Sequence, residues 1–193
     1  MSPRAAKPRG WVDGTSLSST PPPTKEKYMN SLVRNSVGAV ALMLAANGFA
    51  AGQLAVSREI TVDRPPATVW KLVGEFNSLD VWLPPVLGST FTGSATEPGA
   101  VRRLDLGNNA SVTEKLLAYS SARHSYSYAF LKSPLPVKNY VATIELTETA
   151  DGKTLMKWHS TFDPDGATAD KAKEAILGIY DAGLAKVAAI FGK

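Results

Sequence analysis

Arg102 and Glu114 are the two residues of this chain whose types and spacing best suit chemistry. They lie on opposite arms of a hairpin that the sequence predicts over residues 101–118, with Gly107-Asn108-Asn109 as a three-residue loop. In that register Arg102 faces Glu114 on an apolar side of the hairpin. A guanidinium there binds anionic or oxygen-rich groups, and a carboxylate there moves a proton. Because desolvation offsets most of the attraction within a buried ion pair, a ligand cavity is the natural explanation of this pair, with a purely structural pairing as the alternative.

The other residues on the same face of each predicted strand are mostly apolar or aromatic. Such a surface with a few converging polar groups is usual for a small-molecule site, although an ordinary core with paired tyrosine hydroxyls is the alternative. If a bulge shifts the register, Arg103 takes the place of Arg102. At period two the face comprises Arg102, Leu104 and Leu106; Val112, Glu114, Leu116 and Ala118; Tyr126, Tyr128 and Phe130; Tyr140, Ala142, Ile144 and Leu146; and Met156, Trp158, Ser160 and Phe162. The residues that we predict to bind the ligand are Arg102, Glu114, Tyr126, Tyr128, Tyr140, Met156, Trp158 and Trp82.

A long curved sheet and a C-terminal helix are predicted to hold these residues in place. Pro65-Pro66 begins a short helix and Leu79–Pro85 forms a second helical turn. A helix over about Thr168–Phe191 follows the last strand; Asp165 or Thr168 caps it, and its apolar stripe is Ala172, Ile176, Ile179, Tyr180, Gly183, Val187 and Ile190. The predicted strands are Leu54–Asp63, Ser89–Ser94, Ala100–Leu106, Ala110–Ser120, His124–Lys132, Val137–Glu148 and Thr154–Asp163.

The order of these elements predicts an α+β, helix-grip fold. One strand, two short helices and six strands joined by short turns make a seven-stranded antiparallel sheet, which must curl. The long C-terminal helix is expected to lie in the concave side of the sheet. Pro84-Pro85 and the loop Ser133–Pro136 are expected to flank the mouth of the cavity.

The whole net charge of +4 comes from the first fifty residues. Residues 51–193 contain equal numbers of cationic and anionic side chains, so they have no basic excess that would attract a nucleic acid. The chain has no Cys, which excludes disulfides and thiolate metal sites.

The first fifty residues are expected to lie outside the folded domain. Residues 1–28 are rich in Pro, Ser, Thr and Lys and are interpreted as a disordered or untranslated leader, which leaves open whether Met1 or Met29 is the true start. Residues 29–50 have the layout of a secretory signal peptide, with cleavage expected after Ala50. The apolar run Val37–Ala46 is too short for a stable membrane span. We therefore expect a periplasmic or secreted domain of residues 51–193.

Several motifs in this order resemble the START/Bet v 1-like (SRPBCC) superfamily and its polyketide cyclase/dehydrase branch. The stretch Ser133–Tyr140 (SPLPVKNY) and the tail GIYDAGL are most similar to small exported bacterial members, including methanol-oxidation accessory proteins of the MxaD type. The other motifs are PPATVW at residues 65–70, Phe76 with Trp82-Leu83-Pro84, Val101-Arg102, EKLL at 114–117 and Tyr126-Ser127-Tyr128.

The resemblance implies a helix-grip fold around an internal cavity, and it leaves the activity open because this fold serves carriers, sensors, enzymes and accessory proteins. Plant lachrymatory-factor synthases, which are enzymes of this branch, resemble the chain at Arg102, Glu114 and Tyr140. If the protein is an enzyme, the resemblance makes these three residues catalytic.

No motif for a cofactor or a metal is present in the sequence. His124 and His159 are the only histidines, and without added carboxylates two do not make a usual zinc site. There is no phosphate loop, dinucleotide fingerprint or Gly-x-Ser-x-Gly motif. We therefore expect no metal, no cofactor, and histidines at the surface or the rim of the cavity.

These observations favour an exported protein that binds a small hydrophobic ligand or assists a periplasmic oxidoreductase such as methanol dehydrogenase. Its expected partners are the ligand and, in the accessory role, a periplasmic dehydrogenase or cytochrome. The alternative is a cofactor-free cyclase, dehydratase or isomerase that works in the internal cavity. A third possibility is an interaction module whose cavity has lost its role.

Overall fold

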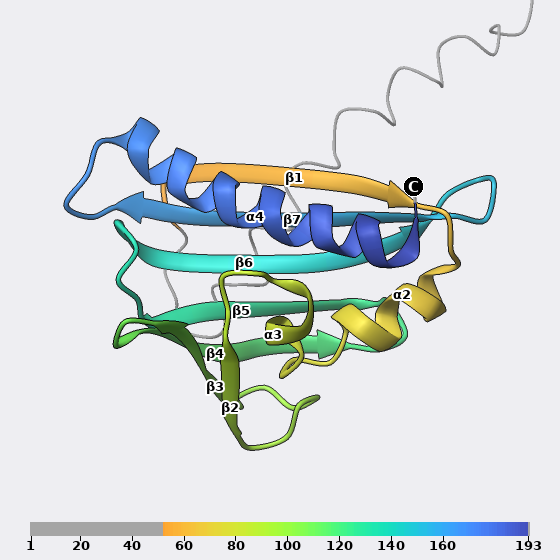
Figure 1. Cartoon of the computed structure of the whole chain (residues 1–193), viewed down its shortest axis with the longest axis horizontal. Coiled ribbons are helices and arrows are strands. Elements are labelled where there is room, and N and C mark those ends of the chain that lie inside the picture. The colour runs from red at the N-terminus through yellow and green to blue at the C-terminus, as the bar shows by residue number, and fades with distance from the viewer. Residues whose placement is uncertain (1–51, 193) are drawn as a thin grey trace, which may run out of the picture. The chain divides into compact units, whose positions relative to one another are not determined.

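A seven-stranded antiparallel sheet makes up most of the computed structural model, which describes residues 52–192 (Figure 1). The strands lie in the order β1-β7-β6-β5-β4-β3-β2, so the chain runs back and forth from β2 to β7 and the first strand pairs with the last. The expectations for residues 1–28 and 29–50 lie outside the described residues. The strands are β1 (Leu54–Val62), β2 (Gly88–Thr92), β3 (Val101–Gly107), β4 (Ala110–Ser120), β5 (Ser125–Lys132), β6 (Val137–Glu148) and β7 (Thr154–Pro164).

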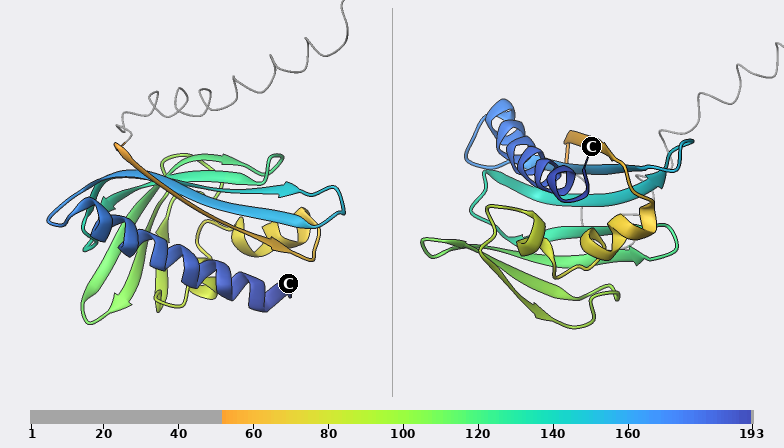
Figure 2. Two further views of the ribbon diagram at one scale, coloured as in Figure 1. Left: turned by 90° about the horizontal axis from the view of Figure 1, so that it is seen from above. Right: turned by 45° about the vertical axis from the view of Figure 1, so that its right-hand side comes forward.

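Three helices lie on the concave side of the sheet (Figures 1 and 2). They are α2 (Pro66–Val73), α3 (Leu79–Trp82) and α4 (Ala169–Phe191). Proline fits the first turn of α2 because that turn needs no N–H donor, and the Thr168 side chain caps α4 by accepting from the amide of Lys171. The predicted helix-grip architecture is therefore confirmed. Within residues 52–192, no helix is both long and apolar enough to cross a membrane.

The buried face of α4 differs from the predicted stripe at its C-terminal end. Ile190 is 44% exposed, so its prediction as a buried stripe residue is wrong, whereas Leu184 and Ala188 are buried. The face is centred on Tyr180, Leu184 and Val187, and at 3.6 residues per turn Ile190 lies at its edge. The helix therefore packs on the sheet through a face slightly rotated from the predicted one.

The β3–β4 hairpin has the predicted register but a different turn. Arg102 pairs with Glu114 on the two strands, while Arg103 is exposed opposite Thr113. The predicted three-residue loop is wrong: Gly107 pairs with Ala110 around a two-residue turn, whose asparagines have φ of 50° and 61°. A turn with two positive φ angles matches the twist of a hairpin, and asparagine tolerates that conformation. A bulge between Asp105 and Gly107 takes up the extra residue, so the register of the pair is unchanged.

A second bulge, in β4, reverses the predicted orientation of Ala118. Leu116 pairs with Tyr128 but Ala118 pairs with Ser127, so one extra residue of β4 lies between them. Beyond that point the alternation of faces is inverted, and Ala118 is exposed instead of lining the concave side. The prediction for Ala118 is therefore wrong, because period-two counting assumes an uninterrupted strand.

Two glycines of α4 provide a matched test of how tightly the helix packs. A Cβ on Gly183 would lie 3.0 Å from the Trp158 ring, 3.1 Å from Leu83 and 3.2 Å from Trp82, whereas a Cβ on Gly178 would meet nothing within 4 Å. We expect Gly183→Ala to lower the free energy of unfolding by about 1–3 kcal/mol through overpacking. Gly178→Ala should raise it by roughly 0.5–1 kcal/mol, because alanine favours the helix. Urea denaturation of both variants checks this, and equal effects would contradict close packing at Gly183.

Candidate functional site

Arg102 and Glu114 form a buried ion pair on the concave side of the sheet. Arg102 Nε donates a hydrogen bond of 2.5 Å to Glu114 Oε2, and the two side chains are 0% and 3% exposed. The pair forms because the residues are direct cross-strand neighbours, where Cβ atoms lie close together. The predicted pairing of a cation and a carboxylate on an apolar face is confirmed.

The remaining contacts of Arg102 tie it to the segment between α2 and α3. Its Nη1 donates to the backbone carbonyl of Phe76, and its guanidinium carbon lies 4.1 Å from the centroid of the Phe76 ring and 5.2 Å from that of Tyr128. Aromatic faces attract a cation, and more strongly when both are desolvated. Arg102 therefore fastens this connection onto the sheet as well as pairing with Glu114.

Burial dominates the electrostatics of the pair. It raises the pKa of the Glu114 carboxyl, and the neighbouring guanidinium only partly opposes that rise. Burial lowers the pKa of Arg102, but Glu114, Tyr126 and Tyr128 together outweigh this effect and the pKa of Arg102 is raised overall. The hydroxyl of Tyr126 lies in the same environment, where burial raises its pKa to about 12. The raised pKa of Arg102 favours its protonated form, and the raised pKa of Glu114 makes its carboxylate a stronger base.

A cavity of about 170 Å³ lies between the sheet, α3 and α4. Its lining is mostly aliphatic and aromatic, and Glu114 is the one carboxyl-bearing side chain among the described residues around it. A few polar groups in an apolar cavity are the usual composition of a small-molecule site. The lining residues are Leu79, Leu83, Pro85, Val86, Leu104, Leu106, Val112, Glu114, Tyr128, Phe130, Leu135, Tyr140, Trp158 and Ile179.

The other polar atoms of the cavity lining bond to one another or to α4. Trp158 Nε1 donates to the Tyr128 hydroxyl at 3.0 Å, and the hydroxyls of Tyr140 and Tyr180 are 2.7 Å apart. The Trp158 ring also stacks on the ring of Tyr180, with centroids 4.2 Å apart. Burial raises the pKa values of Tyr128 and Tyr140 well above the ordinary value, so both remain neutral at physiological pH. These hydrogen bonds hold the aromatic rings in fixed positions around the cavity.

A bulge in β6 turns Val137 to the same face of the sheet as Tyr140, whose predicted orientation is confirmed. The register between β6 and β7 shifts between Lys138 and Val141, and Asn139 has a φ of 53°. Asparagine is one of the few non-glycine residues that tolerate this conformation, and the Asn139 side chain donates to Asp163 at 2.8 Å. As a result Val137 and Tyr140 are both buried in the concave core, which a regular strand would not allow.

The structure divides the eight predicted ligand-binding residues into two groups. Glu114, Tyr128, Tyr140 and Trp158 line the cavity. The other four do not line it but are buried in the same core: Arg102, Tyr126, Met156 and Trp82. Ligand binding by any of the eight, and catalysis by Arg102, Glu114 and Tyr140, stay predictions.

Several lining residues escaped the ligand-site prediction because they come from outside the central strands. Ile179 is on α4, and Leu79 and Leu83 are at α3. The i, i+4 spacing of Leu79 and Leu83 was the available signal, since such residues share one side of a helical turn. Pro85 and Leu135, from the two segments predicted to flank the mouth, also line the cavity.

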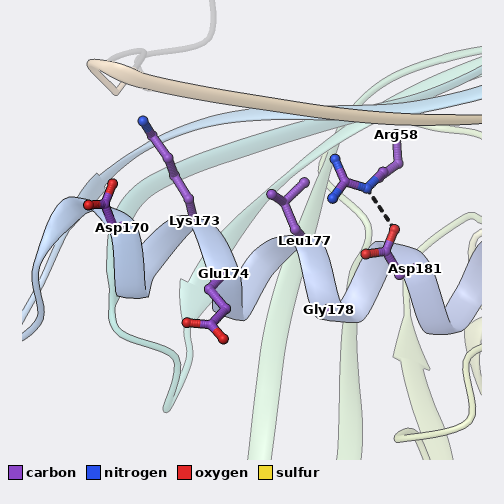
Figure 3. Close-up of a pocket in the computed structure, with 7 residues that line it drawn as sticks. All are labelled: Arg58, Asp170, Lys173, Glu174, Leu177, Gly178 and Asp181. Carbon is purple, nitrogen blue, oxygen red and sulfur yellow. Dashed lines mark hydrogen bonds and ion pairs between the residues drawn. The ribbon is translucent and has the colours of Figure 1, made fainter.

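A second, larger hollow of about 370 Å³ lies between β1 and α4 (Figure 3). Both signs of charge line it, and its one ion pair among the described residues, Arg58 Nε to Asp181 Oδ1 at 2.7 Å, is 41% and 55% exposed. Water screens such a pair, which contributes little. Because this groove is open and its charges are mixed, the smaller internal cavity is the better candidate site. The groove is lined by Arg58, Asp170, Lys173, Glu174, Leu177, Gly178 and Asp181.

The two histidines lie apart from the cavity. The ring of His124 packs on Trp70 with centroids 5.6 Å apart, and His159 Nε2 lies 3.8 Å from a Glu145 carboxylate oxygen. Burial lowers the pKa of His159, although Glu145 opposes this effect. Within residues 52–192 there is no group of three or more His, Cys, Asp or Glu side chains placed to hold a metal ion.

A family model described as "Polyketide cyclase / dehydrase and lipid transport" matches residues 53–192. The comparison with curated proteins found no match. The similarity to this branch, predicted from the sequence motifs, is therefore confirmed.

Solved structures of bacterial proteins have the same fold. XoxI from Bacillus cereus is 30% identical over 71% of this chain and 94% of its own, with a TM-score of 0.66. A putative uncharacterized protein from Bacillus thuringiensis is 28% identical over 72% of this chain and 100% of its own, with a TM-score of 0.67. A protein from Nitrosospira multiformis is 26% identical over 72% of this chain and 97% of its own, with a TM-score of 0.64.

Proposed function

We propose that this chain, which belongs to the polyketide cyclase / dehydrase and lipid transport family, binds a small hydrophobic molecule in the cavity between the sheet, α3 and α4. The observation that carries this proposal is the apolar cavity with the Glu114 carboxylate on its surface. An apolar cavity of roughly 150 Å³ is enough to bind benzene in another protein, so 170 Å³ suits a ligand of about one ring. The family fold fits a ligand-binding or accessory role.

The proposal also includes export and an accessory role beside a periplasmic dehydrogenase or cytochrome. Export rests on the signal-peptide pattern of residues 29–50. The accessory role rests on the resemblance to MxaD-type proteins, and the similarity to the Bacillus cereus protein XoxI is consistent with it. In this role the protein binds its ligand in the cavity and also contacts the dehydrogenase or cytochrome, and it does not need to convert the ligand.

A cofactor-free enzyme is the second candidate, and one observation favours it. Glu114 lines the cavity with a raised pKa, which suits a general base or acid. Tyr128 and Tyr140 line the same cavity and supply hydroxyl groups that could orient a substrate. Arg102 does not line the cavity, so its part in such a reaction would be to hold Glu114 in position.

Native mass spectrometry of the protein purified from its own host tests export and ligand binding together. We expect a polypeptide of residues 51–193 with one small-molecule adduct per chain, and loss of the adduct on denaturation. The polypeptide mass reports the cleavage site and the mass difference reports the ligand. A full-length chain would contradict export. The ligand-binding proposal would be contradicted by two results together: no adduct is found, and toluene, added as an apolar probe, does not bind the purified protein.

A further inference from the structure

Glu114 presents a hydrogen-bond acceptor to the cavity. Its Oε2 receives the hydrogen bond from Arg102 Nε, and a carboxylate has lone pairs on both oxygens for further donors. The side chain lines the cavity although it is only 3% exposed to solvent. An acceptor in such a dry environment bonds strongly to a donor, because the effective dielectric constant is low. The ligand atom beside Glu114 is therefore expected to bear a proton.

Arg102 lies behind Glu114 and is not part of the cavity lining. Phe76 and Tyr128 pack against the guanidinium, while Glu114 and the Phe76 carbonyl accept its hydrogen bonds. Nη2 has no hydrogen-bond partner among the described residues, but it too is completely buried. A ligand in the cavity thus meets the carboxylate first, and the cation that would attract an anion is covered.

The two tyrosine hydroxyls of the cavity are already engaged. Tyr128 accepts from Trp158 Nε1, and Tyr140 shares a hydrogen bond with Tyr180 of α4. A ligand that bonded to the Tyr140 hydroxyl, or donated to the Tyr128 oxygen, would do so beside a partner inside the protein. Glu114 is consequently the group that distinguishes one small apolar molecule from another.

We infer that this cavity selects a small, neutral, mostly apolar molecule that carries a hydroxyl group, and that it rejects carboxylates. This inference rests on the proposed ligand binding. The hydroxyl donates to Glu114 and its apolar body fills the rest of the cavity. A carboxylate ligand would place a second negative charge beside Glu114 and away from water. An ammonium group would add an unpaired charge to a pair that is already neutral, so the uncharged donor is favoured.

Isothermal titration of the purified protein at neutral pH with toluene, phenol and benzoate tests the inference. These probes have the same ring but differ in the substituent that would face Glu114. Because a hydrogen bond to a charged acceptor is among the stronger ones, phenol should bind about tenfold more tightly than toluene, and benzoate should not bind measurably. Benzyl alcohol should likewise bind more tightly than benzaldehyde, which accepts but does not donate.

Two variants assign the preference to Glu114. In Arg102→Met/Glu114→Met the carboxylate is gone, so toluene should bind and the preference for phenol should disappear. Asp181→Asn is the matched control, because it removes a carboxylate that does not line the cavity and should leave the preference unchanged. If the double variant does not fold, the comparison of benzyl alcohol with benzaldehyde on the unaltered protein still decides for or against the inference.

The possible failures are distinguishable. Equal affinities for toluene and phenol, or loss of the preference in Asp181→Asn, would overturn the inference and leave ligand binding intact. Tighter binding of benzoate than of phenol would also overturn it, and would show that Arg102 reaches the ligand. If no probe binds, the proposed function fails together with the inference.

Discussion

Glu114→Gln should lower the free energy of unfolding by about 3–5 kcal/mol, since breaking a buried ion pair leaves its partner uncompensated. The amide has nearly the shape of the carboxylate, so packing is preserved and the lost stability measures the effect of removing the negative charge. Arg102 is completely buried, which denies its guanidinium the water that would otherwise stabilise it. Urea denaturation of the variant and the unaltered protein measures the difference.

Two comparisons make this result specific to the buried pair. Arg102→Met/Glu114→Met should recover most of the stability, because two apolar side chains leave no charge behind. Asp181→Asn breaks the exposed pair with Arg58 and should cost less than about 1 kcal/mol. A neutral effect of Glu114→Gln would mean that the pair contributes nothing in solution. If the protein is an enzyme, Glu114→Gln should also lower turnover by orders of magnitude where binding survives.

Trp158→Ala is the second change with a large expected effect, about 3–5 kcal/mol of lost stability. Trp158 is 1% exposed, stacks on Tyr180, and meets the Trp82 ring edge-on with centroids 5.4 Å apart. Removing the indole also leaves the Tyr128 hydroxyl without its donor. Denaturant unfolding measures the stability that is lost.

The same variant should change what the cavity accepts. Because Trp158 lines the cavity, its truncation enlarges the space, and apolar probes larger than toluene should bind more tightly than they do to the unaltered protein. Trp158→Phe is the matched control: it keeps a ring against Tyr180, so it should lose less stability and gain less capacity. Unchanged probe affinities in Trp158→Ala would contradict an open cavity beside the indole.

The sequence by itself determined the fold class and the pairing of Arg102 with Glu114. Period-two alternation, turn residues and the apolar stripe of α4 are local patterns, and each strand from β2 to β6 pairs with the next strand of the sequence. Even the unexpected bulge near Gly107 did not disturb the pair, because the hairpin retained the same number of residues between its arms. Face assignments were therefore correct wherever the strand remained regular.

Bulges and packing between distant elements were decided only by the tertiary structure. The extra residue in β4 turned Ala118 outward, and the bulge at Asn139 placed Val137 inward on the same face as Tyr140. Neither has a strong local signal, since a bulge depends on how two strands and their twist accommodate each other.

The composition of the cavity lining also depended on tertiary packing. Period-two alternation places Arg102 and Glu114 on one face of the sheet. Only the packing of the segment around Phe76 decides that the guanidinium of Arg102 is covered while the carboxylate of Glu114 lines the cavity. Ile179, Leu79 and Leu83 join the lining because α4 and α3 lie across the sheet. Local periodicity selects a face of the sheet, whereas which part of that face remains unfilled depends on how side chains from elements far apart in sequence pack together.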